Sequence, residues 1–293
     1  MSSYLDGVRG RLWRAYADGR RRVTRAGSAA GSAVACAGVD RSDVEGWTAA
    51  LAERHQAYRD AVEPAGGDTV VVCVSSRPHL LESVVAAVAR QTLAPHEFVL
   101  VANSSGYDDV DIEGTVARLD GSCATTVLRR PAHQSLGACL NDAMDAGSAR
   151  FIAKFDDDDL YGPHHLADAL RAHSYAGAGV VGKHTYYAHL VGSDTTVLRF
   201  PAHEFLYSST LAGGSLVIDR ARTGDLRFDD ISLGEDRAFI AACHRRGVST
   251  FSADRFNFVQ TRAHDNTWQV PDDAFLRSTT EVGDGVRLDV TDI

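Results

Sequence analysis

Long hydrophobic runs are missing from this 293-residue sequence, although 44% of its residues are hydrophobic. No stretch reaches the roughly 18–20 apolar residues that a membrane-spanning helix needs, and no apolar region follows Met1 as it would in a secretory signal peptide. We therefore expect a globular protein of one large or two modest domains, cytoplasmic and without a transmembrane segment.

An excess of basic residues is also lacking, since the net charge is −9 and the isoelectric point is about 5.7. Nucleic-acid-binding proteins usually carry a basic stripe or patch, so no nucleic-acid partner is expected. Paired cysteines are lacking too, because the five cysteines are odd in number and form no CxxC pair. This pattern fits reduced thiols and argues against a disulfide framework or a zinc site.

The chain does contain four consecutive aspartates, at 156–159, directly after the strand-like segment 151–155. Pro163 then opens a segment, 164–173, whose apolar residues recur at helical spacing. Four adjacent like charges repel unless a cation lies among them, and clustered oxygen ligands suit Mg²⁺ or Mn²⁺. The run predicts a metal site at the carboxyl end of a strand, where open α/β sheets bind ligands; the alternative is a solvated acidic turn.

Strand and helix patterns alternate around this run, which favours an α/β fold with a right-handed, mostly parallel sheet flanked by helices on both faces. After residue 173 the regularity loosens, and from Pro271 onward the tail is polar without convincing periodicity. The predicted strands are 69–74, 97–102, 125–128, 151–155, 180–190, 196–200, 213–218 and 255–261, and the predicted helices are 78–91, 136–146, 164–173 and 235–246.

The first 66 residues differ in composition from the rest. Seven arginines crowd residues 9–25, and a Gly/Ala/Ser-rich passage follows at 26–38; the arginines are either a membrane-surface or subunit contact or a solvated basic face. Ser42 and Glu45 match a capping box for a helix that runs to about Val62. We expect a basic, helical extension (1–66), a catalytic domain (67–270) with a nucleotide-binding half (67–160) and an acceptor half (161–270), and a polar tail (271–293).

Taken in order, these motifs resemble the family 2 glycosyltransferases, which are inverting, nucleotide-sugar-dependent enzymes with the GT-A variant of a Rossmann-like fold. The resemblance covers about residues 68–268, and the order of the motifs is more specific than any single motif. The similar segments are 72–78, 90–92, 97–101, 135–144, 156–159, 213–214, 234–236 and 264–268.

The resemblance implies a role for individual residues. The acid run resembles the family's DXD motif, so that Asp158 would be a metal ligand and Asp156 or Asp157 would bind the ribose. Asp236 resembles the general base that deprotonates the acceptor hydroxyl, although a helix-start acid is the alternative. His264 resembles a further ligand of the metal or the diphosphate, but an isolated histidine is more often structural. The remaining donor-binding candidates are Arg77, Asn103, Glu235 and Trp268, the last either a stacking partner of sugar or base or a core or lid residue.

Each role has a physical reason. A bound Mg²⁺ or Mn²⁺ stabilises the charge that develops on a leaving diphosphate, and a hydroxyl becomes a better nucleophile when a carboxylate removes its proton. One departure from the family matters: Asn103 follows the second strand where many relatives carry an aspartate that binds uracil. An amide both donates and accepts, so uridine is in doubt as the base, and guanine and thymine nucleotides stay open.

The leading hypothesis is a metal-dependent, inverting transfer from a nucleoside-diphosphate sugar to a small-molecule or glycan acceptor. A second hypothesis is a nucleotide-sugar mutase on the same fold, which would interconvert pyranose and furanose rings. A third is a sugar-nucleotide-binding protein without catalysis, in which the arginine-rich segment is a docking arm. Pocket shape sets the sugar, base and acceptor, so the sequence leaves these open, together with homo-oligomerisation.

Overall fold

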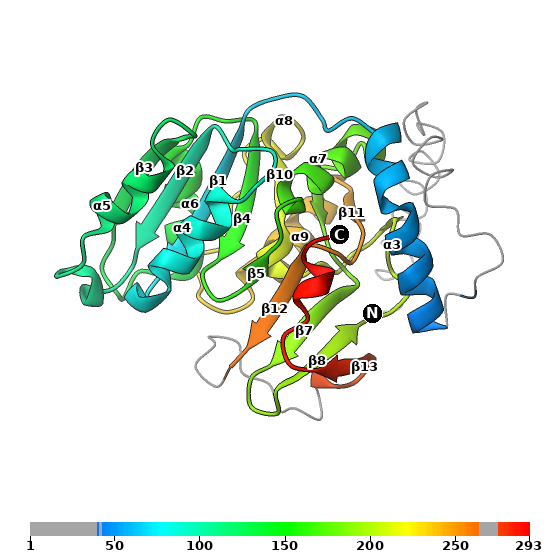
Figure 1. The fold of residues 1–293 in the computed structure, drawn as a ribbon. Helices are drawn as coiled ribbons and strands as arrows, with labels where there is room; N and C mark the ends of the chain where they lie inside the picture. The colour runs from blue at the N-terminus through cyan, green and yellow to red at the C-terminus, as the bar shows by residue number, and fades with distance from the viewer. Residues whose placement is uncertain (1–39, 41–42, 264–274) are drawn as a thin grey trace, which may run out of the picture.

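The computed structural model describes residues 40, 43–263 and 275–293. Its central sheet has the strand order β3-β2-β1-β4-β10-β6-β11-β9 (Figure 1). β1 to β4 run parallel, β10 is antiparallel to β4, and the sheet as a whole is mostly parallel, as expected. The bounds are β1 (Thr69–Ser75), β2 (Glu97–Ala102), β3 (Ala124–Arg129), β4 (Phe151–Asp156), β10 (Val217–Asp219), β6 (Val180–Gly182), β11 (Thr250–Ser252) and β9 (Leu206–Tyr207).

Helices cover both faces of this sheet, which confirms the predicted α/β class. Alternate β1 residues pack into opposite clusters, Val71 and Cys73 toward one face and Val70 and Val72 toward the other, as period-2 alternation requires. α4 (Leu81–Ala89), α5 (Ile112–Val116) and α7 (His165–Ala176) pack on the first face. α6 (Leu136–Ala146) and α9 (Glu235–Arg245) pack on the second, and the short helix α8 (Arg220–Thr223) follows β10.

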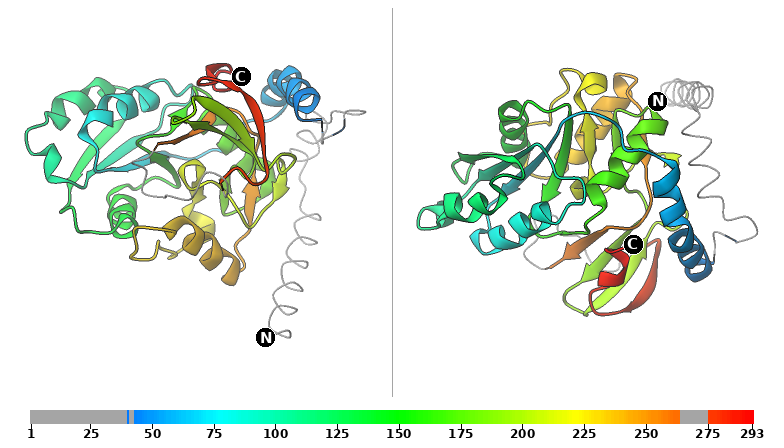
Figure 2. Two further views of the ribbon diagram at one scale, coloured as in Figure 1. Left: turned by 90° about the horizontal axis from the view of Figure 1, so that it is seen from below. Right: turned by 45° about the horizontal axis from the view of Figure 1, so that its top comes forward.

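A second sheet lies beside the first, in the order β13-β8-β7-β12-β5 (Figures 1 and 2). It joins segments far apart in sequence. β7 and β12 pair in parallel at its centre, and each has an antiparallel partner on its other side, β8 for β7 and β5 for β12. Its strands are β5 (Leu160–Tyr161), β7 (Tyr186–Leu190), β8 (Thr195–Arg199), β12 (Phe258–Arg262) and β13 (Thr279–Asp284).

Several predicted elements differ from the structure. The single strand expected at 180–190 is two strands, β6 and β7, which belong to different sheets. Between them the Lys183 ammonium binds the Asp254 carboxylate at 3.0 Å, and the His184 N–H donates to Ser252 Oγ. These bonds replace the strand ladder, so the chain leaves the first sheet here.

The other differences lie at element boundaries. The strand expected at 213–218 begins with the 3₁₀ turn Gly213–Ser215, and the helix expected at 78–91 begins with the 3₁₀ turn Pro78–Leu80. The strand expected at 255–261 starts only at Phe258, because Asn257 adopts a left-handed conformation (φ 61°). The tail, for which no element was predicted, contributes the edge strand β13, whose alternation is broken by an irregularity between Glu281 and Gly283.

The predicted amino-terminal helix is α3 (Val44–Ala61), and it packs against the second sheet rather than standing apart. Its Trp47 and Leu51 are buried with Tyr187 and Phe256. The capping residue is Asp43, whose carboxylate accepts a hydrogen bond from the Gly46 N–H at 3.0 Å, while the predicted cap Ser42 lies outside the described residues. None of the described helices is both long and apolar enough to cross a bilayer.

A buried ionic group fastens α3 to α7. Asp168, only 1% exposed, accepts hydrogen bonds from His55 at 3.2 Å, from Arg59 at 2.8 Å and from Arg171 at 3.3 Å. Burial alone would raise the pKa of the Asp168 carboxyl, but the His55 and Arg59 hydrogen bonds lower it well below its ordinary value. These partners therefore favour the ionised form of the Asp168 carboxyl.

We expect Asp168→Ala to lower the free energy of unfolding by about 3–5 kcal/mol, because it leaves buried cations without their partner. Urea unfolding of the variant measures this loss. Asp289→Ala, which breaks the exposed Asp289–Arg287 pair, is the matched control and should cost no more than about 1 kcal/mol. Equal losses in both variants would contradict the role given to Asp168.

Candidate active site

The predicted nucleotide-contacting residues share one edge of the central sheet. Asp156 ends β4, Arg77 follows β1 by two residues and Asn103 follows β2 directly. Because β1 is parallel to both β2 and β4, these carboxyl ends meet at the same edge, which is where α/β sheets bind ligands.

Arg77 bridges two of the four aspartates. Its Nε donates to Asp157 Oδ2 at 3.2 Å, and its Nη1 pairs with Asp158 Oδ2 at 2.9 Å. Asp157 is buried and also accepts a 2.5 Å hydrogen bond from Ser75 Oγ, which in turn accepts one from the Tyr107 hydroxyl at 2.7 Å. Asp157 Oδ1 accepts a further hydrogen bond from Arg77 Nη2. Both Asp157 oxygens are thus held by the protein, which orients the Arg77 guanidinium along the edge.

Asp156 is held from two directions. Its carboxylate forms an ion pair with Lys154, a lysine that is only 3% exposed. Burial opposes the charged form of Lys154, yet the Asp156 and Glu235 carboxylates raise the pKa of Lys154 above its ordinary value. The Asp156 N–H donates to the Tyr161 hydroxyl at 2.7 Å, and this hydroxyl donates to the Gly214 carbonyl at 2.8 Å.

The last two aspartates show the repulsion that the sequence predicts. Burial, followed by the charge of Asp156, raises the pKa of the Asp158 carboxyl to about 6. Burial and the charge of Asp158 raise the pKa of the Asp159 carboxyl well above its ordinary value, although the Thr261 N–H donates to it at 2.9 Å. A hard divalent cation would relieve this repulsion, so the donor set suits Mg²⁺ or Mn²⁺.

Gly213 and Gly214 lie between the acid run and Asp236. A Cβ atom at position 213 would approach Asp236 Oδ2 to 2.5 Å, and one at position 214 would lie 2.4 Å from Asp159 Oδ2 and 2.9 Å from Asp156 Oδ2. Any side chain here would displace these carboxylates. The diglycine therefore brings Asp236 close to the acid run, which lies almost 80 residues earlier in the chain.

Asp236 and Glu235 form the first turn of α9, where the helix dipole favours negative charge. Asp236 is half-buried, and its Oδ1 accepts a 2.6 Å hydrogen bond from the Arg237 N–H. Glu235 is buried, and burial, followed by the opposing effect of Lys154, leaves the pKa of its carboxyl raised. Two adjacent acids thus have different environments, one accessible and one enclosed.

Of three further residues predicted to contact the donor or the metal, the structure describes one. The Asn103 amide donates to the Pro131 carbonyl at 2.6 Å and its side chain is half-buried. His264 and Trp268 lie outside the described residues, so their predicted roles stay predictions.

The sequence analysis assigned no catalytic or binding role to Ser75, Lys154 or Tyr161. Tyr161 follows the acid run closely, but only the fold turns its hydroxyl back toward Asp156 and Gly214. The sequence feature that could have identified Lys154 is its charge within an otherwise apolar strand. A buried strand tolerates a charged side chain only when that side chain has a partner.

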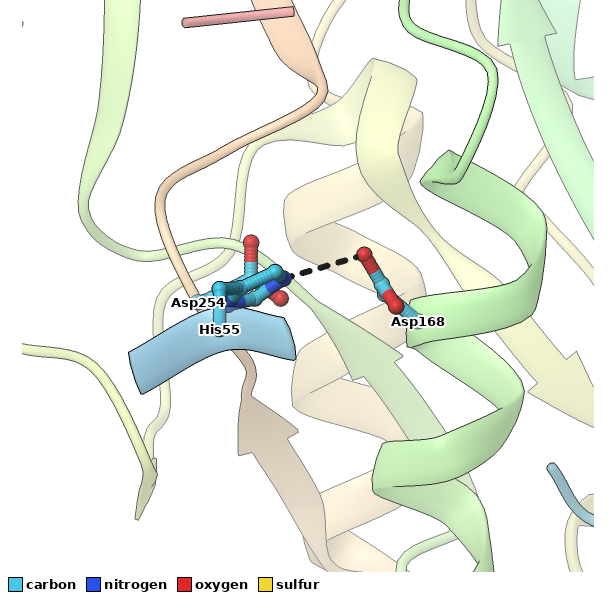
Figure 3. A group of neighbouring side chains, drawn as sticks. All are labelled: His55, Asp168 and Asp254. Atoms are coloured by element: carbon cyan, nitrogen blue, oxygen red, sulfur yellow. Dashed lines mark hydrogen bonds and ion pairs between the residues drawn. The ribbon is translucent and has the colours of Figure 1, made fainter. Parts of the chain in front are cut away.

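A second group of potential metal ligands consists of His55, Asp168 and Asp254, whose ligand atoms all lie within 4.8 Å of one another (Figure 3). In the part of the chain that the structure describes, this is the one such group of three. Its charges are already balanced, because Arg59 and Arg171 pair with Asp168 and Lys183 pairs with Asp254. A divalent cation here would add to an existing positive charge, so this group fits a structural network better.

Comparisons with known structures agree with this fold. The mannosyltransferase PcManGT from Pyrobaculum calidifontis, solved with GDP-Man and Mn²⁺, matches with a TM-score of 0.53 and 16% identity over 70% of this chain and 60% of that one. TarS residues 1–349 from S. aureus, solved with UDP-GlcNAc, matches with a TM-score of 0.53 and 16% identity over 72% of this chain and 64% of that one. The chain thus spans less than two thirds of either structure, and the likeness shows the fold.

A search of curated proteins found no match. The model of glycosyl transferase family 2 matches residues 69–224, just over half of the chain, from β1 to the end of α8. This region includes Arg77, the acid run and the diglycine, and Asp236 follows it. The chain therefore belongs to glycosyl transferase family 2.

Proposed function

We propose that this protein is a glycosyltransferase that moves a sugar from a nucleoside-diphosphate sugar to an acceptor hydroxyl, in one displacement that inverts the anomeric carbon and depends on Mn²⁺ or Mg²⁺. The observation that carries the proposal is the meeting of the acid run with Asp236 across Gly213 and Gly214. Donor-binding acids and a candidate base thereby share one edge of the sheet, as a transfer between two bound substrates requires.

The nucleotide would bind along the carboxyl ends of β1, β2 and β4. Arg77 would contact the nucleotide, and Asn103 would contact the base. Of the two candidates for the ribose, Asp156 is favoured over Asp157, because both Asp157 oxygens already accept bonds from Ser75 and Arg77. Glu235 and Trp268 complete the proposed donor site.

Asp158 is the proposed metal ligand within the DXD-type run, and His264 is a second. Support comes from the raised pKa of Asp158, which reflects negative charge that a cation would neutralise. When bound, such a cation supplies electrostatic stabilisation of the leaving diphosphate. Asp158 also contacts Arg77 at 2.9 Å, so its carboxylate would exchange or share this partner on metal binding.

Asp236 is the proposed general base. It is the more accessible of the two acids in the first turn of α9, where the helix dipole favours negative charge. Its Oδ1 accepts the Arg237 N–H, and Oδ2, the atom facing Gly213, would take the proton of the acceptor hydroxyl. The acceptor is a small molecule or a glycan.

We place this reaction in the cytoplasm, since the four described cysteines are free thiols, as expected in a reducing compartment. Two proteins of the same fold suggest which donor nucleotides to test. One was solved with GDP-Man and another with UDP-GlcNAc. With Asn103 in place of an aspartate, guanosine, thymidine and uridine diphosphates are all to be tested.

A thermal-shift screen of GDP, UDP and dTDP, each with and without Mn²⁺, tests the proposal. One nucleotide is expected to stabilise the protein selectively and only with the metal, by about 2.7 kcal/mol at 100 times its Kd. Incubation of the matching nucleotide sugar with Mn²⁺ but no acceptor then separates the reactions. Slow hydrolysis or no change supports the transferase, whereas an isomeric nucleotide sugar would indicate a mutase. Stabilisation by none of the nucleotides would overturn the proposal.

A further inference from the structure

The loop 228–234 leads into α9 and is fastened along its length to the amino-terminal half of α6. At its start, the Asn141 side chain binds both backbone groups of one residue. Its Nδ2 donates to the Phe228 carbonyl at 2.9 Å, and its Oδ1 accepts from the Phe228 N–H at 3.0 Å. An amide is suited to this pair of bonds, because it carries a donor and an acceptor side by side.

The middle of the loop is fastened by close backbone contact. The Gly137 N–H donates to the Ile231 carbonyl at 3.0 Å, and a Cβ atom at position 137 would lie 1.9 Å from the Asp229 carbonyl oxygen. Ser135 Oγ donates to the Asp230 carboxylate. The first turn of α6 thus fits this loop only with glycine at position 137.

The fastened loop is coupled to the helix that carries the acids. The Phe228 ring, 4% exposed, stacks on Phe239 of α9 with ring centroids 4.5 Å apart and planes at 22°. Phe239 lies three residues after Asp236, about one helical turn along α9. Asn141 therefore holds Phe228, and Phe228 holds α9 near its amino terminus.

We propose that Asn141, together with Gly137, is a positioning element for the transfer reaction. By fixing the loop 228–234 and the Phe228–Phe239 stack, it sets where the first turn of α9 presents Asp236 relative to the acid run across Gly213. This inference rests on the proposed function, because it assumes that the placement of Asp236 limits the chemical step.

A comparable pair of hydrogen bonds, which serves as the control, lies at the carboxyl end of α6. Arg220 donates to the Gly147 carbonyl at 2.9 Å and to the Met144 carbonyl. It binds α6 through two backbone contacts, as Asn141 binds Phe228, but at the end remote from the loop 228–234. Loss of either the Asn141 or the Arg220 hydrogen bonds should lower the stability of the fold. Only loss of the Asn141 bonds should alter the placement of Asp236.

The test compares Asn141→Asp, Asn141→Ala and Arg220→Met in steady-state kinetics and thermal unfolding. Asn141→Asp keeps the acceptor for the Phe228 N–H and loses the donor to the Phe228 carbonyl. We expect kcat to fall about 10²-fold in Asn141→Asp, as for a displacement near 1 Å, with the KM for the nucleotide sugar within about threefold of the original. Arg220→Met should lower Tm and leave kcat within about twofold.

If kcat falls in proportion to the loss of Tm, and does so to the same extent in the Asn141 and Arg220 variants, the inference is overturned. Asn141 would then have only a structural role. If Asn141→Ala does not fold, the isosteric Asn141→Asp still decides the matter. The proposed function is tested separately by Asp236→Asn. An inactive Asp236→Asn with fully active Asn141 variants would sink only the positioning role, whereas an active Asp236→Asn would sink the base assignment itself.

Discussion

Asp236→Asn is expected to lower the rate of sugar transfer by about 10²–10⁴-fold, the usual contribution of a general base. Asparagine has the size of aspartate but cannot take the acceptor's proton, and it still fits against Gly213. Nucleotide binding should persist, because the donor would be held by the β1, β2 and β4 edge. Transfer kinetics, together with thermal shift in the presence of the nucleotide and Mn²⁺, measure the two effects independently.

The matched control is Asp225→Asn, which neutralises an exposed aspartate paired with Arg246. It should leave transfer unchanged. A normal transfer rate in Asp236→Asn would remove this residue from the base role, and loss of nucleotide binding in the same variant would instead indicate a structural or donor-binding role.

Asp158→Asn is expected to abolish the Mn²⁺-dependent part of nucleotide binding and, with it, transfer. Loss of a partner outside the ligand shell typically costs about 10–100-fold in metal affinity, so loss of a direct carboxylate ligand should cost at least about 100-fold. Arg77 would keep its bonds to Asp157, so the fold of the edge should survive. The measurement is the thermal shift produced by the nucleotide at increasing Mn²⁺ concentrations.

His55→Gln is the informative comparison, because it disrupts the other group of potential ligands, at Asp168 and Asp254. It should lower the baseline Tm and preserve the Mn²⁺ effect. If Asp158→Asn retains that effect while His55→Gln loses it, the metal belongs to the buried group beside α3 and not to the acid run.

Local pattern predicted the central sheet well. β1, β2 and β4 are buried strands in a parallel sheet, and their sequences are mostly apolar, with Lys154 as the exception inside β4. The sequence placed Arg77, Asn103 and the aspartates after three separate predicted strands, and the parallel pairing of β1 with β2 and β4 brings them to one edge. The bounds of α6 were predicted to the residue, because Ser135 is an effective cap and the apolar spacing is regular.

Patterns could not predict how distant segments would meet. The segment 180–190 carries the polar residues Lys183, His184 and Thr185 between apolar ones, but their spacing does not show that the chain passes from one sheet to another at Lys183. The edge strand β13 is half-exposed and irregular, and it exists because β8 supplies its hydrogen bonds. These elements depend on partners that a window of neighbouring residues does not contain.

By itself, the sequence determined the α/β class, the family and the carboxylates available to the site, because strand periodicity, helix caps and a run of carboxylates are local properties of the chain. Only the tertiary structure decided that the diglycine would bring Asp236 to the acid run, that Lys154 would be buried against Asp156, and that Asn141 would hold the loop before α9. Such contacts join residues tens of positions apart, and packing, rather than the spacing of residues along the chain, selects them.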